Sequence, residues 1–192
     1  MGSVISILNH RKQVEQPVLI LVGLHESDHA PVPPDLLKAA LANCEAVLNL
    51  ARSAHIAVAF VRCMVSSSVH SEPRAYPAWL KGFEPTRDDM IFDVTQPSCY
   101  SNIEFAQAME YSRGNFAIAG LFGETTCLST AIDAHHRRHS FTYLCDASAC
   151  RNNGTLPATM FHDAVSQVMS VYGEVMEGAR WSRVLSSNRR SQ

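Results

Sequence analysis

An apolar run, a short turn and a helical pattern follow one another in residues 116–136, FAIAGLFGETTCLSTAIDAHH. The run Phe116–Ala119 is short and continuously apolar, as expected for a strand that is buried on both faces. After the turn, apolar residues recur at helical spacing over Ser129–His136. A buried strand that leads into a helix is the unit from which parallel sheets are built. This stretch therefore predicts an α/β protein.

The same alternation extends in both directions along the chain. Pro33-Pro34 interrupts the chain before an amphipathic stretch that reaches Leu48, and Asp35 is the expected N-cap of that helix. Because parallel strands need crossover helices, the pattern predicts a three-layer Rossmann-like fold with a central parallel sheet flanked by helices. The other expected strands are Val18–Val22, Ala57–Val61, Met90–Val94, Thr142–Cys145 and a weaker one around Glu174–Met176, and the other expected helices are Ile103–Tyr111 and Pro157–Val171.

The chain length fits one domain. A chain of 192 residues, 46% of them hydrophobic, can bury one core but not two of ordinary size. We predict a single domain over residues 1–192, with loosely ordered ends at about 1–16 and 186–192. The long connection from Met64 to Asp89 contains several aromatic residues and is expected to be an ordered loop. Its aromatics either cap a pocket, contact a neighbouring subunit or fasten the loop to its own core.

The composition excludes several classes of partner. The 16 basic and 18 acidic residues are scattered, so no nucleic-acid-binding or membrane-binding surface is expected. The longest apolar run, Pro17–Val22, is far too short to span a membrane, and the first ten residues lack the layout of a secretion signal. A cytoplasmic location is the expectation. The six cysteines form no Cys-x-x-Cys pair and are expected to be free thiols.

Three pairs of residues carry a family resemblance. Ala119-Gly120 ends a strand, Thr130-Ala131 follows one helical turn after the expected start of a helix, and Asp146-Ala147 ends the next strand. Together with Gly23-Leu24-His25 and Ser98-Cys99-Tyr100, this layout resembles that of the isochorismatase-like cysteine hydrolases and covers most of the chain. The resemblance implies a hydrolase that acts on a small amide, ester or enol ether.

The resemblance also implies a catalytic triad. In such enzymes a thiolate at a helix N-terminus attacks an electrophile, an aspartate moves the proton and a lysine supports the charge. The aspartate position falls on Gly23, and His25 replaces the glutamine that usually follows. The lysine position falls on Asp93, Val94 or Gln96, and the only lysines in the chain are Lys12, Lys38 and Lys81.

The nucleophile position falls on Thr126, one residue before Cys127. One residue on a helix corresponds to a rotation of about 100°. Cys127 is therefore either the nucleophile, brought into place by a one-residue insertion in the turn, or a buried structural thiol. Thr126 is expected to line the site, as are Tyr100, Gly123 and Glu124.

Histidines offer the remaining candidates. His25 follows the first strand and could act as a general base or as a hydrogen-bonding group. His135, His136 and His139 with Asp133 could hold a metal, but a cationic cluster at the end of a helix is the expected favourable interaction with the helix dipole. No metal and no cofactor are expected.

Three hypotheses for function follow. The first is a divergent hydrolase in which Cys127 attacks and His25 or Asp93 carries the proton. The second is a catalytically silent relative that binds a small molecule or a partner protein. The third is a non-hydrolytic enzyme that uses His25 as a base. The resemblance also implies a homo-oligomer.

Overall fold

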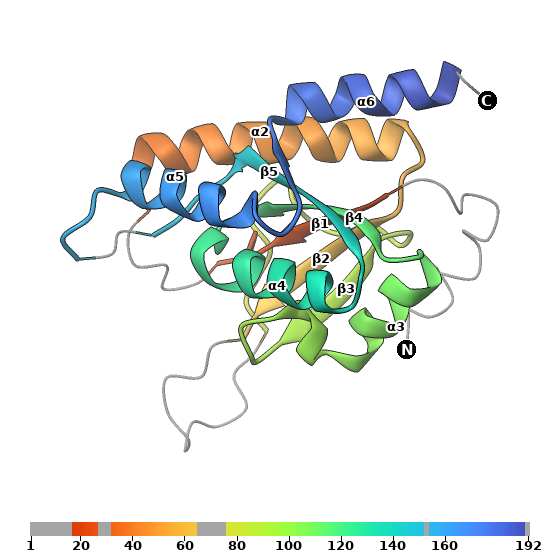
Figure 1. The fold of residues 1–192 in the computed structure, drawn as a ribbon, viewed down its shortest axis with the longest axis horizontal. Coiled ribbons are helices and arrows are strands. Elements are labelled where there is room, and N and C mark those ends of the chain that lie inside the picture. Colours follow the sequence, from red (N-terminus) through yellow and green to blue (C-terminus); the bar gives the residue numbers. More distant parts are fainter. Residues whose placement is uncertain (1–16, 27–31, 65–75, 152–153, 191–192) are drawn as a thin grey trace.

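A six-stranded sheet forms the centre of the computed structural model, which describes residues 17–26, 32–64, 76–151 and 154–190. The strand order is β3-β2-β1-β4-β5-β6, and every pair of neighbours is parallel. The predicted three-layer α/β fold is confirmed (Figure 1). The strands are β1 (Val18–Val22), β2 (Val58–Cys63), β3 (Met90–Val94), β4 (Asn115–Gly120), β5 (Ser140–Ser148) and β6 (Glu174–Met176).

Helices cover both faces of the sheet (Figure 1). One face packs against α2 (Pro34–Ser53) and α6 (Gly178–Arg190). The other packs against α3 (Ile103–Tyr111), α4 (Leu128–His136) and α5 (Ala158–Met169). A short 3-10 turn, η1 (Cys99–Ser101), precedes α3, and a π-helical turn, η2 (Gly123–Cys127), precedes α4. Two hydrophobic cores result, one on each side of the sheet.

The central strand β1 contributes to both cores. All five of its residues are buried. Leu19 and Leu21 point toward α2 and α6, whereas Val18, Ile20 and Val22 point toward α3, α4 and α5. A strand that is buried on both faces has no polar side chain, which explains its continuous apolar run.

Several predicted elements have the predicted bounds. Strands β1, β3 and β6 and helix α3 begin and end where expected. The N-cap of α2 is Pro33 rather than Asp35, which lies in the first turn. Proline at the first helical position has its φ angle preset, and an acidic side chain in the first turn interacts favourably with the helix dipole.

Helix α6 was not predicted. Only Trp181 and Leu185 on it are buried apolar residues, and they lie one turn apart against the core shared with α2. Two apolar residues are too weak a pattern to predict a helix of this length. The helix includes residues 186–190, which were expected to be loosely ordered, whereas residues 1–16 and 191–192 lie outside the described part of the chain.

The aromatic residues of the long connection pack on their own chain. Residues 65–75 are outside the described range, but Trp79 pairs with His25 in an isolated antiparallel bridge. Its ring centroid is 5.5 Å from that of Phe60, and Phe83 is buried. These contacts fasten the segment after residue 75 to the core on the α2 side. Across the described residues, no helix has the length and apolar character needed to span a membrane.

We predict that Phe105→Ala costs about 3–5 kcal/mol of unfolding free energy, because Phe105 is fully buried between Phe92 and Tyr100. Ile103 on the same helix is 73% exposed, so Ile103→Ala is the matched control and should change stability by less than about 0.5 kcal/mol. Urea unfolding followed by circular dichroism measures both values. Equal losses in the two variants would contradict this packing.

Candidate functional site

Because all strands of the sheet are parallel, their carboxyl ends lie at one edge. The segments that follow the neighbouring strands β2, β1, β4 and β5 lie in the middle of this edge. The chain leaving β4 is held between its neighbours, since the Leu121 amide donates to the Val22 carbonyl at 3.0 Å and the Gly123 amide donates to the Ala149 carbonyl at 3.2 Å. In open parallel sheets, ligands bind beyond this edge, so these segments form the candidate site.

Gly23 occupies the position at which the resemblance implies an aspartate. Its φ angle is +72°, and a Cβ atom built on it would lie 2.2 Å from Cδ2 of Phe122. Phe122 itself is buried. Its ring therefore fills the space that a side chain at residue 23 would need, and an aspartate could not occupy this position without displacing it.

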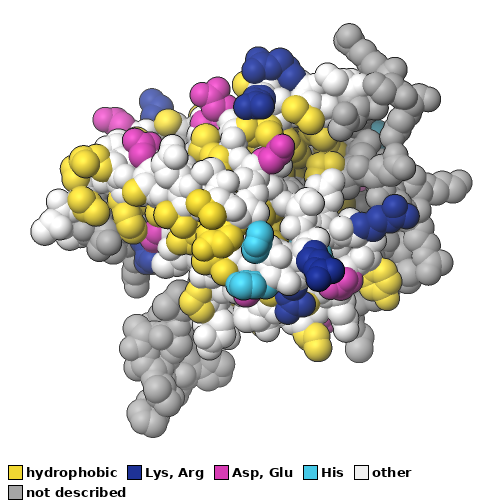
Figure 2. Space-filling view, in the orientation of Figure 1, with side chains coloured by type: hydrophobic (Ala, Val, Ile, Leu, Met, Phe, Trp, Pro, Cys, Tyr) yellow, Lys and Arg dark blue, Asp and Glu magenta, His cyan; other side chains and the backbone are white. Residues whose placement is uncertain are grey.

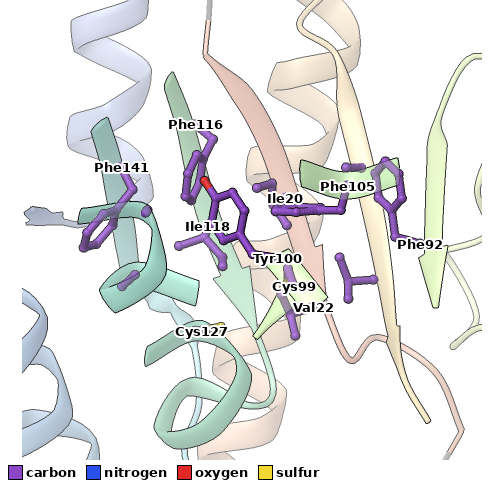
Figure 3. Close-up of a cluster of buried hydrophobic side chains, with 14 of the residues drawn as sticks. Ile20, Val22, Phe92, Cys99, Tyr100, Phe105, Phe116, Ile118, Cys127 and Phe141 are labelled. Carbon is purple, nitrogen blue, oxygen red and sulfur yellow. The ribbon is translucent and has the colours of Figure 1, made fainter. Parts of the chain in front are cut away.

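Cys127 lies inside the core and not on an open surface. Its side chain is 0% exposed and belongs to the cluster that includes Val22, Cys99 and Ala131 (Figure 3). Burial raises the pKa of the Cys127 thiol well above its ordinary value, and nearby Cys99 and Cys63 raise it further. A thiol in this environment stays protonated, whereas a nucleophilic cysteine needs a lowered pKa.

The turn before α4 positions both Thr126 and Cys127. The Cys127 amide donates to the Phe122 carbonyl at 3.0 Å, which is the wider spacing of a π-helical turn. Thr126, which is almost fully buried, places its Oγ1 atom 3.4 Å from the Sγ atom of Cys63. The turn therefore directs Cys127 into the core and places Thr126 against Cys63 at the end of β2.

His25 is fully buried at the end of β1. Its Nε2 atom is 3.1 Å from the Cys63 amide nitrogen, which can only donate. Nε2 must therefore be the unprotonated acceptor, and Nδ1 carries the proton, which it can donate to the Glu26 carbonyl at 3.2 Å. Both ring nitrogens link main-chain segments, so the structure gives His25 a bridging position between β1 and β2.

Asp93 and Gln96 lie apart from Cys127. Phe92 and Val94 point into the core that contains Cys127, so Asp93, which alternates with them on β3, points to the other face of the sheet. There its carboxylate pairs with Arg62, with an Nε–Oδ1 distance of 2.6 Å and an Nη2–Oδ2 distance of 3.1 Å. Gln96 is exposed. Neither residue supplies a cation to the edge.

Arg62 is also held by aromatic rings on that face. Its Cζ atom is 4.3 Å from the centroid of the Tyr76 ring and 5.1 Å from that of Trp79. The guanidinium group thus ties β2 to both β3 and the segment after residue 75.

Tyr100 is directed away from the candidate site. Its hydroxyl lies 2.7 Å from Nδ1 of His139, which follows the C-terminal end of α4. Figure 3 shows the hydroxyl on the side of the core away from Cys127. His135 and His136 are exposed, and the described residues contain no group of three or more His, Cys, Asp or Glu side chains suited to a metal ion.

The motif residues shared with the resemblance have structural contacts. The Thr130 hydroxyl accepts a hydrogen bond from the Cys99 amide at 2.9 Å. Oδ1 of Asp146 accepts one from the Gly178 amide at 2.7 Å, and the Ala147 carbonyl accepts one from the Cys44 thiol at 2.9 Å. These residues hold η1, α6 and α2 in place around the sheet.

Arg151 is the residue at this edge that the sequence analysis missed. Its Nε atom donates to Oε1 of Glu124 at 2.6 Å, and its Cζ atom lies 5.2 Å from the centroid of the Phe122 ring. The Glu124 side chain is only 8% exposed, whereas that of Arg151 is 35% exposed. Because the resemblance implies a lysine, an arginine was not expected in this role. A basic residue a few positions after the strand predicted at Thr142–Cys145 was the available signal.

The geometry defines a Rossmann-like α/β protein with a strand, turn and helix at the carboxyl edge of its sheet. A family model for the isochorismatase domain matches residues 22–179, and the chain belongs to the isochorismatase-like family. No curated protein sequence matches the chain significantly.

Solved structures with this fold are similar over most of their length. A cysteine hydrolase from Pseudomonas syringae pv. phaseolicola has a TM-score of 0.76 and 18% identity, with 89% of this chain and 92% of that chain covered. An isochorismatase from Pseudomonas putida has a TM-score of 0.73 and 19% identity, with 87% and 90% covered. An isochorismatase family protein from Burkholderia thailandensis has a TM-score of 0.71 and 16% identity, with 88% and 95% covered. At these identities the likeness shows the shared fold.

We predict that Gly23→Ala is more destabilising than Gly82→Ala. Both glycines have positive φ angles, +72° and +91°, so both substitutions carry backbone strain of roughly 1–2 kcal/mol. Only Gly23 faces a side chain, whereas a Cβ atom at Gly82 would have no neighbour within 4 Å. We expect Gly23→Ala to cost at least about 1 kcal/mol more than the control because the Phe122 ring must move.

Urea unfolding of both variants and of Gly23→Ala combined with Phe122→Ala measures this contact. Removing the ring should recover part of the additional loss in a double-mutant cycle. An additive result would show that the Phe122 ring is not what excludes a side chain at residue 23.

Proposed function

We propose that this chain is a catalytically silent member of its family that binds a small anionic molecule at the carboxyl edge of the sheet. Catalytic silence is supported by the Phe122 ring beside Gly23 together with the complete burial of Cys127. Thiolate hydrolysis needs an accessible, ionisable thiol and a group that moves its proton. Neither requirement is met by the residues at these positions.

Arg151 supports an anionic ligand. Its ion pair with Glu124 uses Nε, and the ring of Phe122 supports the guanidinium plane. Among the described residues, no hydrogen-bond acceptor lies against the terminal nitrogens of Arg151, so their donors remain for a carboxylate or another oxyanion. The nearby start of the helix formed by η2 and α4 adds the positive end of a helix dipole.

The two enzymatic hypotheses require reactive groups at Cys127 and His25, and the surroundings of both residues disfavour that reactivity. A divergent hydrolase requires the Cys127 thiolate, which burial disfavours. A base at His25 requires a ring nitrogen that can exchange a proton with a substrate, yet hydrogen bonds to main-chain groups engage both nitrogens. Binding of a ligand requires neither a thiolate at Cys127 nor a free ring nitrogen at His25.

We predict that Cys127 in the native protein is inert to iodoacetamide between about pH 5 and 9, because its raised pKa keeps the thiol protonated and its burial excludes the reagent. Cys145 is the internal control, since it is half-buried whereas the other five cysteines are buried. Mass spectrometry of labelled peptides gives a rate for each thiol, and unfolding in urea should make all six react. Selective fast labelling of Cys127, with an apparent pKa below the ordinary value of about 8.5, would refute the silent assignment.

We predict that small carboxylates raise the melting temperature of the wild-type protein and that Arg151→Gln abolishes most of this increment. A ligand that binds only the folded state stabilises it by about 2.7 kcal/mol at a hundredfold excess over its Kd. Differential scanning fluorimetry with a panel of mono- and dicarboxylates measures the increment relative to each variant's own unliganded melting temperature. This reference separates ligand binding from the stability lost with the Glu124 ion pair.

Arg113→Gln is the matched control, because Arg113 is an exposed arginine in the turn before β4, at the opposite edge of the sheet. Its increment should equal that of the wild type. An increment that survives in Arg151→Gln, or that disappears equally in Arg113→Gln, would count against Arg151 as the anion-binding residue.

A further inference from the structure

The hydroxyl of Tyr143 is a buried polar group that has no hydrogen-bond partner among the described residues. Tyr143 lies on β5 and is 0% exposed, in the core on the α4 and α5 side of the sheet. The Ser148 hydroxyl is nearby, but it already donates to the Leu144 carbonyl at 2.8 Å and accepts from the Gly120 amide at 3.3 Å. Because buried tyrosine hydroxyls are normally paired, this one points to a partner that the protein itself does not supply.

The hydroxyl lies against the turn at which the candidate site begins. A Cβ atom built on Gly123, the first residue of η2, would lie 2.7 Å from the Tyr143 hydroxyl oxygen and 2.9 Å from the Cys150 sulfur. His162 on α5 places its Nδ1 atom 3.6 Å from the same sulfur. Polar side chains from β5, from the segment after it and from α5 therefore converge beside Gly123.

Glu124 connects this group to Arg151. Burial raises the pKa of the Cys150 thiol to about 12, and the nearby Glu124 carboxylate contributes to the rise. The same carboxylate accepts a hydrogen bond from Nε of Arg151 at 2.6 Å. Burial also raises the pKa of the Tyr143 hydroxyl well above its ordinary value, so this hydroxyl stays protonated and can donate at neutral pH. A cation and a neutral donor thus lie on either side of Cys150 and Glu124.

Helix α5 covers these polar groups from outside. Its outer surface is apolar, since Met160 is 60% exposed and Val168 is 45% exposed, and Figure 2 shows hydrophobic side chains gathered over it. The Arg151 side chain at the carboxyl edge is 35% exposed. A polar ligand would therefore enter beside Arg151 and not through the surface of α5.

We propose that the anion held by Arg151 also hydrogen-bonds the Tyr143 hydroxyl, so that the site selects hydroxy- and oxo-carboxylates. The proposal rests on the anion binding proposed above for Arg151. The guanidinium group takes the carboxylate, and the neutral tyrosine takes a hydroxyl or carbonyl oxygen a few bonds away. Because Gly123 and Cys150 cover the hydroxyl in the unliganded protein, binding requires the Cys150 side chain to move aside.

The charge at this position disfavours a dicarboxylate. A second carboxylate beside Tyr143 would be buried next to Glu124, with a neutral hydroxyl as its donor in place of a cation. An ion in such a place loses its hydration without a compensating charge. The ligand class is therefore a monoanion with one further uncharged oxygen.

Isothermal titration calorimetry with four acids of similar size tests the selectivity. Propionate is the reference, and 2-hydroxypropionate, 3-hydroxypropionate and 2-oxopropionate each add one oxygen to it. We expect at least one of the three to bind the wild type about fivefold more tightly than propionate, which is the effect of one neutral hydrogen bond. Tyr143→Phe should abolish this advantage and leave the affinity for propionate unchanged.

Tyr111→Phe is the matched control, because Tyr111 on α3 is 68% exposed and loses the same hydroxyl atom. It should keep the wild-type advantage. Differential scanning fluorimetry checks folding, and the unliganded melting temperature of Tyr143→Phe should not fall, since the hydroxyl that it removes has no partner among the described residues.

The outcomes separate this inference from the function on which it rests. A wild type that binds all four acids equally overturns the selectivity and leaves the anion site at Arg151 standing, whereas a wild type that binds none of them overturns both. An advantage that persists in Tyr143→Phe, or that is lost equally in Tyr111→Phe, overturns the role of Tyr143. So does a lower unliganded melting temperature of Tyr143→Phe, which would show that the hydroxyl already has a partner within the protein.

Discussion

The burial of β1 on both faces is the constraint on which the rest of the structure depends. Its five residues have no polar side chain, and they lie between β2 and β4 in parallel register. Such a strand is stable only if helices cover both faces of the sheet, and α2 with α6 on one side and α3, α4 and α5 on the other do so. The same arrangement places Gly23 beside the end of β4, in the middle of the carboxyl edge.

The contact between Gly23 and Phe122 determines which side chain fills the middle of this edge. A residue without a side chain at the end of β1 leaves room for the aromatic ring, and the ring in turn lies beside His25 and Arg151. The space that a side chain at residue 23 would need is thereby filled by the Phe122 ring. The edge also holds an ion pair between Glu124 and Arg151 and the start of a helix, and these support the proposed binding of an anion.

Predictions from the sequence were accurate where the local apolar pattern matches the burial of the element in the folded protein. The strands β1 and β3 and the helix α3 have their predicted bounds because a buried strand and an amphipathic helix carry periodic signals of their own. Helix α6 has only Trp181 and Leu185 as buried apolar contacts, so its stability comes from packing against the sheet and α2, which no local pattern reports. Arg151 was missed for a related reason: its partner Glu124 is distant in sequence and meets it only where the ends of β4 and β5 converge.

The sequence by itself determined the fold class and the family, because strand periodicity and motif identity are properties of the residues alone. Only the tertiary structure decided the orientation of Cys127, since the rotation between successive residues in a π-helical turn differs from that in an α-helix and changes the direction in which a side chain points. It also decided that Asp93 pairs with Arg62 on the opposite face of the sheet and that Tyr100 bonds His139 at the far edge. Such choices depend on which side chains meet across the sheet, and distances through space are not encoded in the spacing along the chain.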